Sequence, residues 1–348
     1  MYNRTIDYLK QPATKANWKD IKTELIGGLD ASWAAIAPYQ VRSLAVKDAC
    51  TAVSKCKRAT RSTGEPHEAS FRCKHASKQS FYLPKQAIDS VGFFKRTLGP
   101  MKYAETLPEI KYDCRVVYEH GLWYVTIPVS ITVQVPKTKE LIVALDPGVR
   151  TFQTLYSPRV AGTIGDRAWE RLLKLCYALD RLKSKLEARD CRAKQRRNLR
   201  KAYRRHSRNI QRLKDELHWK TAVFLAKSFH LIIIPEFSAK EMSRRNKRKI
   251  RNKTVRSMLT LSHYMFRERL KQAAEKYGSR VFVVSEAYTS RTCTRCGHDH
   301  EHLAGAKTFV CPQCGLRVSR DINGARNILL RAMPDLATAF RSLSINEC

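Results

Sequence analysis

Leu-Ile-Val-Ala-Leu-Asp-Pro-Gly, at residues 141–148, is the stretch that decides the fold. Five consecutive apolar residues that end at a carboxylate and a Pro-Gly turn are typical of a short buried strand. A second stretch of this kind, Leu-Ile-Ile-Ile-Pro-Glu-Phe, occupies residues 231–237. Since strand and helix patterns alternate along residues 141–330, the sequence predicts a mixed α/β domain there.

Working outward from residue 141, the periodicity of the apolar residues predicts further elements. Downstream we expect strands at 151–156 and 280–285, and helices beginning near Asp166 and covering 257–277 and 322–332. Upstream, residues 1–60 have a helical pattern that includes 39–61, and the Ser-Thr-Gly-Glu-Pro stretch at 62–66 ends it. Residues 115–119 and 123–133 are predicted strands, joined by a His120-Gly121 turn.

Charge indicates the kind of partner. The chain has 348 residues, with 66 Lys and Arg against 31 Asp and Glu, and a net charge of +35. A chain this basic repels itself unless a polyanion screens it, and nucleic acid is the expected polyanion. We find no signal peptide, lipidation signal or apolar run near ~18 residues, so we expect an intracellular protein with no membrane partner. The odd number of cysteines, 11, also argues against a fully paired disulfide framework.

Two segments concentrate the positive charge. Residues 181–215 hold 15 Lys and Arg against three acids, which favours a track for phosphates over a merely solvated charged helix. Residues 243–253 are a second basic run, either a loop that contacts nucleic acid or a nuclear localisation signal. The predicted nucleic-acid-binding residues are Arg192, Lys194, Arg196, Arg197, Arg200, Lys201, Arg204, Arg205, Arg244, Arg245, Lys247, Arg248 and Lys249.

Two CxxC pairs lie near the C-terminus. Cys293 and Cys296 form the first and Cys311 and Cys314 the second, and a glycine follows each pair. This spacing is typical of a zinc ribbon, in which two knuckles present four thiolates to one tetrahedral Zn²⁺. Because four thiolates complete the tetrahedron, we expect a structural ion. His298, His300 and His302 could replace a ligand, but such histidines more often lie on the loop surface.

Three acids follow predicted buried elements. Asp146 and Glu236 end the two apolar strands, and Asp321 begins the helix after the cysteines. Carboxylates that converge at one sheet edge bind Mg²⁺ or Mn²⁺, and two such ions can drive phosphodiester hydrolysis. Taken singly, Asp146 could serve the turn, Glu236 could be a surface acid and Asp321 could cap the helix. Their joint arrangement with the ribbon favours the catalytic interpretation.

At these residues the sequence resembles a known family. The order is strand-Asp-x-Gly, strand-Glu, Thr-Ser-Arg-Thr-Cys-x-x-Cys-Gly, Cys-x-x-Cys-Gly and Arg-Asp-x-Asn-x-Ala-x-Asn-Ile. It looks like the RuvC-type nuclease domain of the transposon-encoded TnpB proteins and their eukaryotic and viral relatives, the Fanzor proteins. The Ile-Pro-Glu-Phe form and the Leu-His-Trp-Lys stretch at 217–220 look closer to Fanzor. The resemblance covers roughly residues 80–333.

The resemblance implies an α/β fold with an RNase H-like (RuvC) nuclease domain. The implied order is a helical recognition lobe (1–77), a β-rich wedge domain (78–140), the nuclease domain in two parts (141–288 and 319–333) around the zinc ribbon (289–318), and a C-terminal tail (334–348). Family members usually carry a strand before the first recognition helix. Since residues 1–4 begin almost inside that helix, we expect the wedge domain to lack its first strand.

The resemblance also implies an activity, namely RNA-guided cleavage of double-stranded DNA by a transposon-associated endonuclease. Asp146, Glu236 and Asp321 match the catalytic acids and the four cysteines match the zinc ligands. The guide RNA would derive from the protein's own locus and pairing would read the target sequence. In a eukaryotic host the protein would act in the nucleus.

Three other functions fit these residues less well. A nucleic-acid-binding regulator or transposase-accessory protein of the same ancestry would be expected to lose acids, yet all three are present. A strand-transfer transposase of the common type orders its acids Asp, Asp, Glu, whereas the order here is Asp, Glu, Asp. A ribosomal-type RNA-binding protein would account for the charge and the ribbon but not for the acids.

Overall fold

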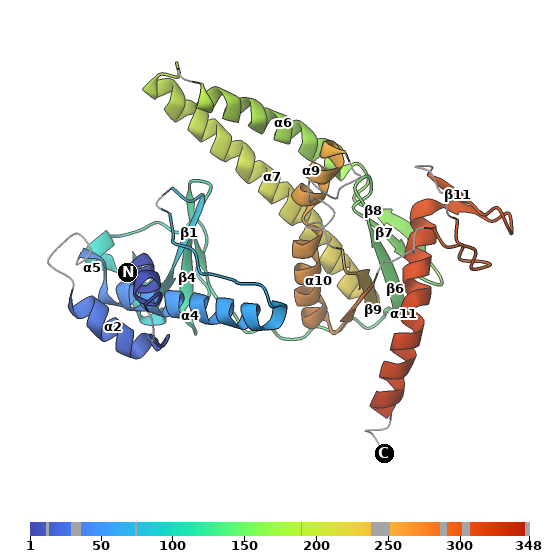
Figure 1. The fold of residues 1–348 in the computed structure, drawn as a ribbon, viewed down its shortest axis with the longest axis horizontal. Helices are drawn as coiled ribbons and strands as arrows, with labels where there is room; N and C mark the ends of the chain where they lie inside the picture. The colour runs from blue at the N-terminus through green and yellow to red at the C-terminus, as the bar shows by residue number, and fades with distance from the viewer. Residues whose placement is uncertain are drawn as a thin grey trace. The chain divides into compact units, whose positions relative to one another are not determined.

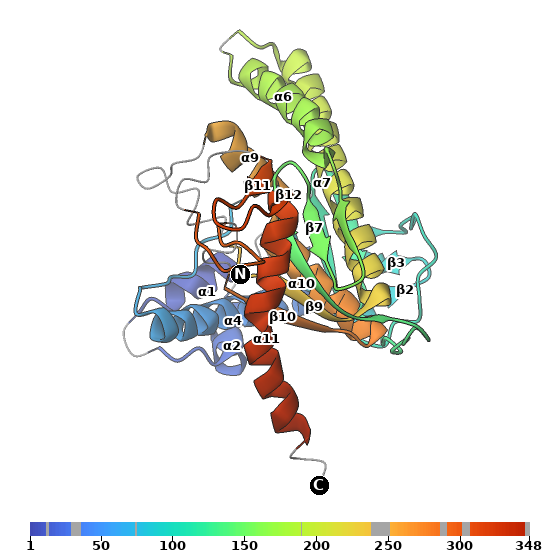
Figure 2. The ribbon, with the colours of Figure 1, turned by 90° about the vertical axis from the view of Figure 1, so that its right-hand side faces the viewer.

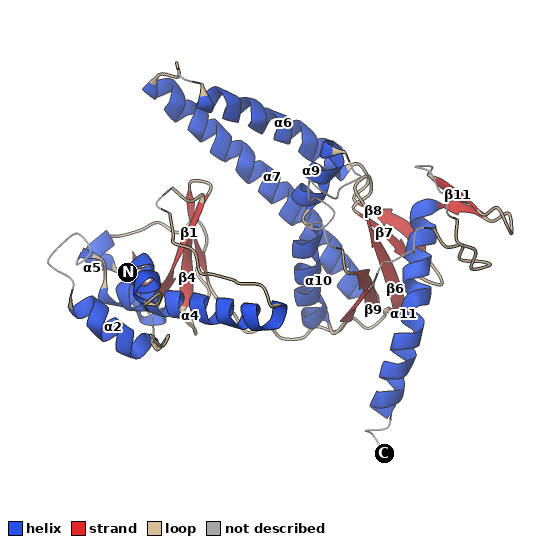
Figure 3. Cartoon of the chain, in the orientation of Figure 1, coloured by secondary structure: helices blue, strands red, loops and turns tan. Residues whose placement is uncertain are grey.

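The computed structural model describes the chain except residues 12–13, 29–35, 74, 189, 238–250, 286–290, 301–306 and 345–348. It divides into two compact units, Met1–Ser130 and Ile131–Cys348 (Figure 1). Each unit contains both helices and strands (Figure 3).

Among its described residues, the first unit begins with the helices α1 (Tyr2–Tyr8), α2 (Trp18–Gly27) and α4 (Tyr39–Thr63). Their buried contact is made by Ile21 and Leu25 of α2 and by Val46 and Cys50 of α4. The helix predicted over 39–61 is confirmed, and α4 ends at Gly64, whose φ of 70° stops a helix readily.

A three-stranded antiparallel sheet follows, in the order β1 (Lys78–Leu83), β4 (Cys114–Glu119) and β5 (Leu122–Thr126). The predicted hairpin turn is confirmed, since Glu119 pairs with Leu122 around two residues of positive φ. The prediction of a strand as far as residue 133 is wrong. β5 ends at Thr126, because Pro128 has no N–H for the ladder.

Short elements complete the first unit: η1 (Lys85–Ala87), β2 (Ile88–Asp89), β3 (Gly92–Phe93) and α5 (Lys95–Leu98). Helices and sheet are tied together by Asp48 of α4, whose Oδ2 accepts from Arg72 at 2.7 Å and from Arg115 of β4 at 2.9 Å. The segments predicted as helical lobe and wedge thus pack on one another.

The second unit is built on a five-stranded sheet in the order β10-β9-β6-β7-β8. Its strands are β6 (Glu140–Pro147), β7 (Gln153–Tyr156), β8 (Ala161–Ile164), β9 (Phe229–Pro235) and β10 (Arg280–Val284). β6, β9 and β10 are parallel, whereas β7 and β8 continue from β6 as antiparallel neighbours. The predicted mixed α/β domain is confirmed.

Helices cover both faces of this sheet, because alternate residues of β6 point to opposite sides. Val143 and Leu145 pack with α6 (Ala168–Glu187), α7 (Ala193–Ser228) and α10 (His263–Tyr277). Ile142 and Ala144 pack with α11 (Arg320–Ser344), which Figure 2 shows running along the other face. The sheet is therefore the middle layer of three.

Two predicted helices differ from the structure. The helix predicted over 257–277 is two helices, α9 (Asn252–Leu261) and α10, separated by Ser262 at φ 55°. His218 explains the break, since its Nε2 donates to the carbonyl oxygen of Leu261 at 2.8 Å in place of a helical N–H. The last helix, α11, starts at Arg320 and runs through Pro334, beyond the predicted range of 322–332.

Candidate functional site

Two of the predicted catalytic acids lie at the ends of neighbouring parallel strands. Ala144 of β6 is level with Ile233 of β9, so Asp146 is level with Pro235, and Glu236 lies one residue beyond. The backbone N–H of Glu236 donates to Val284 at 2.8 Å, which holds it beside the end of β10. Asp146 is half-buried and Glu236 is exposed. Both acids occupy the same edge of the sheet, as the sequence predicts.

The third acid is brought to this edge by α11. Asp321 lies in the first turn of the helix. Three residues on, Gly324 is buried against Asp146: a Cβ built at position 324 would lie 2.6 Å from Asp146 Oδ2. Since residues three apart share a helix face, Asp321 and the carboxylate of Asp146 lie along the same side of α11.

The three carboxylates lie at one edge but do not form one tight cluster. Among the residues that the structure describes, the four-cysteine set is the group of metal-ligating side chains that meets so closely. The donors nevertheless suit a hard divalent cation, which takes carboxylate oxygens. The missing side chain of Gly324 leaves the space that Asp146 occupies. Because the three carboxylates do not form one tight cluster, a metal site that they share stays a prediction.

Behind the edge lies an aromatic stack that sequence analysis missed. The ring of Phe152 is stacked between His218 and His263, at 5.3 Å from each. His263 also contacts the ring of Phe237, the residue after Glu236, at 4.8 Å. Burial lowers the pKa of His218 to about 4 and, together with the neighbouring His218, that of His263 to about 3. Both histidines are therefore neutral at pH 7, and they serve the packing beneath the acid-bearing strands.

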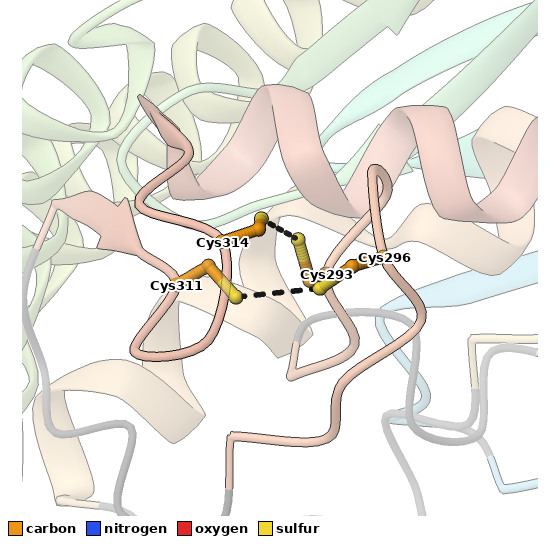
Figure 4. Close-up of side chains that lie close together, drawn as sticks. All are labelled: Cys293, Cys296, Cys311 and Cys314. Carbon is orange, nitrogen blue, oxygen red and sulfur yellow. Dashed lines mark hydrogen bonds between the residues drawn. The ribbon is translucent and has the colours of Figure 1, made fainter.

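The four cysteines converge as predicted (Figure 4). Sulfurs of opposite knuckles approach in pairs, with Sγ–Sγ distances of 3.6 Å for Cys293–Cys314 and for Cys296–Cys311. Gly297 and Gly315 turn the two knuckles at φ 77° and 70°, where a side chain would be strained. Four thiols at this spacing fit a tetrahedral Zn²⁺.

Two of the thiols have shifted pKa values. Burial raises the pKa of Cys311, but hydrogen bonds from the backbone N–H groups of Cys314 and Gln313 and from the thiols of Cys296 and Cys314 lower it overall. The backbone N–H of His298 lowers the pKa of Cys296, but burial and the other three thiols raise it overall. His298 and His300 lie outside the thiol group: the carbonyl of His298 accepts from Cys293, and the ring of His300 packs on Phe309. His302 lies outside the described residues.

Two buried asparagines tie the ribbon to α11. Asn323 Nδ2 and Asn327 Nδ2 donate to the same carbonyl oxygen of Thr292, at 2.8 and 2.6 Å. The Oδ1 of Asn323 accepts from the backbone N–H of Thr294 at 3.3 Å. The first zinc knuckle is thereby fixed to the helix that carries Asp321. The sequence signal for this contact was the spacing of the two asparagines, since residues four apart in Asn-x-Ala-x-Asn lie on the same face of a helix.

The predicted basic track lies on a helical hairpin of α6 and α7, a pair of long neighbouring helices in Figure 1. Within the described residues, none of the predicted contact residues on α7 or at its start forms an ion pair with an acid. These are Arg192, Lys194, Arg196, Arg197, Arg200, Lys201, Arg204 and Arg205, all exposed except the half-buried Arg196. Arg244, Arg245, Lys247, Arg248 and Lys249 lie outside the described residues.

No helix in the described ranges has the length and apolar character needed to cross a membrane.

Comparison with known proteins places this arrangement in a family. The family model "Cas12f1-like, TNB domain" matches residues 263–328, from α10 through the ribbon into α11. "Putative transposase R186" of Acanthamoeba polyphaga mimivirus is 31% identical over 333 residues, which are 90% of this chain and 67% of that protein. The chain belongs to the TnpB-like transposase family.

Further relatives of this TnpB-like chain come from viruses and bacteria. "Putative transposase A625R" of Paramecium bursaria Chlorella virus 1 is 35% identical over 68% of this chain, which spans about half (54%) of that protein. "Putative RNA-guided DNA endonuclease InsQ" of Escherichia coli (strain K12) is 26% identical over 94% of the chain and 81% of InsQ.

A solved structure shares the fold. A Cas12f1–sgRNA–target DNA complex aligns with 94% of this chain and 79% of its own, with a TM-score of 0.52 at 15% identity. The TnpB-like chain therefore has a mixed α/β fold like that of Cas12f1, with a four-cysteine cluster that fits a zinc ribbon.

Proposed function

We propose that this TnpB-like protein is an RNA-guided DNA endonuclease associated with a transposable element. The observation that carries the proposal is the packing of Asp146 against Gly324, one helical turn from Asp321, at the sheet edge where Glu236 also lies. Acids at two adjacent strand ends and on the first turn of the helix that reaches them are an exception in a chain of net charge +35, and the missing side chain of Gly324 leaves room for the carboxylate of Asp146.

The proposed catalytic domain has the RNase H-like (RuvC) fold. Support comes from a mixed sheet that is covered by helices on both faces and carries acids at the ends of adjacent parallel strands. In this proposal residues 1–77 are a recognition lobe, 78–140 a wedge domain, 141–288 and 319–333 the nuclease domain, 289–318 a structural zinc ribbon and 334–348 a tail.

Asp146, Glu236 and Asp321 would hold Mg²⁺ or Mn²⁺, which when bound lowers the pKa of water and stabilises charge on a phosphodiester. The chain's own part is positional. β6 and β9 hold two carboxylates at adjacent strand ends, and Gly324 lets α11 approach the first. The two asparagine bonds to Thr292 fix the orientation of α11 against the ribbon.

The proposed partners are a guide RNA from the protein's own locus and double-stranded target DNA. The hairpin of α6 and α7 supports this, because the lysines and arginines predicted as contacts at residues 192–205, which form no ion pair within the described residues, suit the phosphates of an RNA scaffold or heteroduplex. The printed names of InsQ and of the Cas12f1 complex point to the same partners. Guide pairing would supply sequence specificity.

The test begins with the protein co-expressed with its native locus. The co-purified RNA is sequenced, and plasmids carrying the matching target are incubated with the complex and Mg²⁺. We expect D146N, E236Q and D321N each to reduce cleavage by at least about 100-fold, the scale of lost metal catalysis. D335N, which alters an exposed acid of the same helix α11, is the matched control and should cleave normally.

RNA content and target binding are measured in parallel, and both should be retained in all four variants. If the parent complex binds RNA and target but does not cut, the protein is a regulator of the same ancestry and not a nuclease. Joined rather than cut DNA ends would indicate a transposase. Cleavage that survives in D146N would overturn the site assignment.

A further inference from the structure

A cavity of about 610 Å³ lies beside the acid edge, and its lining is basic. Four separate segments contribute a cation: Arg150 after β6, Arg167 before α6, Lys253 in α9 and Lys307 before β11. All four residues are exposed, so their side chains are accessible from solvent.

The backbone connects this cavity to two of the proposed catalytic acids. Val149 and Arg150, which line it, follow Asp146 by three and four residues. On the other side, the carbonyl of Lys307 accepts from the N–H of Arg320 at 2.9 Å, next to Asp321. The cavity therefore lies next to the residues that follow Asp146. It also lies next to Lys307, which is hydrogen-bonded to the residue before Asp321.

The charges in the cavity are available to a ligand. Within the described parts of the chain, none of the four cations forms an ion pair. Two acids also line the cavity, Asp166 and Glu170, and Asp166 already accepts from Thr151 Oγ1 at 2.9 Å. Arg167 N donates to the carbonyl of Arg150 at 3.2 Å, which keeps these two arginines together. The balance is positive, and two guanidinium groups suit phosphate oxygens.

We propose that this cavity binds a backbone phosphate of the DNA strand that enters the acid edge. This rests on the proposed function, since it names how that site holds its substrate. The aromatic residue in the lining, Trp169, is only 6% exposed and packs in the core, so it offers no face on which a base could stack. We therefore expect the contact to be independent of the DNA sequence. Cations placed beside the carboxylates would hold the strand against their repulsion.

The test uses DNA binding, so that it does not depend on cleavage. In the D146N background, the complex with its co-purified RNA is titrated with complementary single-stranded DNA. Replacing Arg150 and Lys307 together by Gln should weaken DNA binding about tenfold at moderate salt. Because each lost phosphate contact removes about 0.7 from the magnitude of the slope of log K against log salt, the loss of this one contact should make that slope shallower by about 0.7. K137Q/R280Q removes the same charge at two exposed residues outside the cavity, which form no ion pair within the described residues, and should bind like the parent.

A second probe locates the contact. Single methylphosphonate linkages, which lack the phosphate charge, are placed one at a time along the DNA. We expect one linkage near the cut to weaken binding to the parent but not to R150Q/K307Q. A double variant that binds DNA like the parent, or whose binding is weakened by the same linkage that weakens binding to the parent, would overturn the cavity assignment. Loss of cleavage in D146N itself tests the proposed function separately.

Discussion

Gly324 of α11 lies so close to Asp146 of β6 that a Cβ at position 324 would be 2.6 Å from the carboxylate oxygen Oδ2. Gly324→Ala should therefore displace this carboxylate. A shift of about 1 Å at a reacting group can cost on the order of 100-fold in rate, so we expect cleavage to fall by that order. The measurement is the single-turnover cleavage rate of the RNA complex.

The matched control is Gly162→Ala in β8, where a new Cβ would meet only Leu155 at 4.0 Å. It should cleave like the parent, and both variants should keep the helix content of the parent by circular dichroism. A fully active Gly324→Ala complex would show that the position of Asp146 is not decisive.

Removing a ribbon-to-helix bond should loosen the first knuckle while zinc stays bound. Asn327→Ala deletes the 2.6 Å bond to the Thr292 carbonyl, which Asn323 still reaches. We expect a loss of about 1 kcal/mol in stability, the usual net worth of such a bond, and a faster amide exchange of the first knuckle. The check is hydrogen exchange by mass spectrometry together with zinc content. Asn209→Ala, at an exposed position of α7, should leave this exchange unchanged. If the amides of the first knuckle exchange equally slowly in both variants, Asn327 does not hold the ribbon to α11.

Loss of a thiol should empty the ribbon. Cys311→Ser removes one of four convergent sulfurs, so zinc measured by plasma emission should fall from about one ion per chain to near zero at low free zinc. Because the knuckles rely on the metal for their fold, the ribbon should also become sensitive to protease. Cys73→Ser, an exposed cysteine of the first unit, should retain the full zinc content; zinc retained in Cys311→Ser would refute a four-thiolate site.

Acidification should destabilise the second unit before its carboxylates titrate. The folded protein keeps His218 and His263 neutral, with each pKa well below the usual 6.5, whereas the unfolded chain protonates both. Their contribution is complete above pH 6.5 and is lost as pH falls toward 4, by roughly 2–4 kcal/mol near pH 5. Denaturant titrations at pH 7.5, 6 and 5 measure it.

His263→Asn should be less stable at pH 7.5 but should lose less on acidification, since one of the two groups is gone. The exposed His230 of β9 provides the control, and His230→Thr should keep the pH dependence of the parent. An unchanged pH dependence in His263→Asn would contradict the assignment of this effect to the buried pair.

The sequence predicted most of the second unit because its strands are long apolar runs and its ligands have fixed spacing. Asp146, Glu236 and the four cysteines could be placed from local pattern alone. The break at Ser262 could not, since it depends on His218, which lies 43 residues from Leu261 along the chain. The contact of Gly324 with Asp146 and the bonds of Asn327 also escaped prediction, because they join segments far apart in sequence. Pro128, by contrast, was a local signal that should have ended the predicted strand earlier.

The position of α11 also fixes an order of events during synthesis. One face of β6 and β9 is covered by Ile328, Leu329, Ala332 and Leu336, all of which follow the ribbon. On the ribosome, the basic α7 is complete about a hundred residues before these side chains exist. The hairpin of α6 and α7 can therefore form while one face of the sheet is still bare, and α11 brings Gly324 against Asp146 only afterwards.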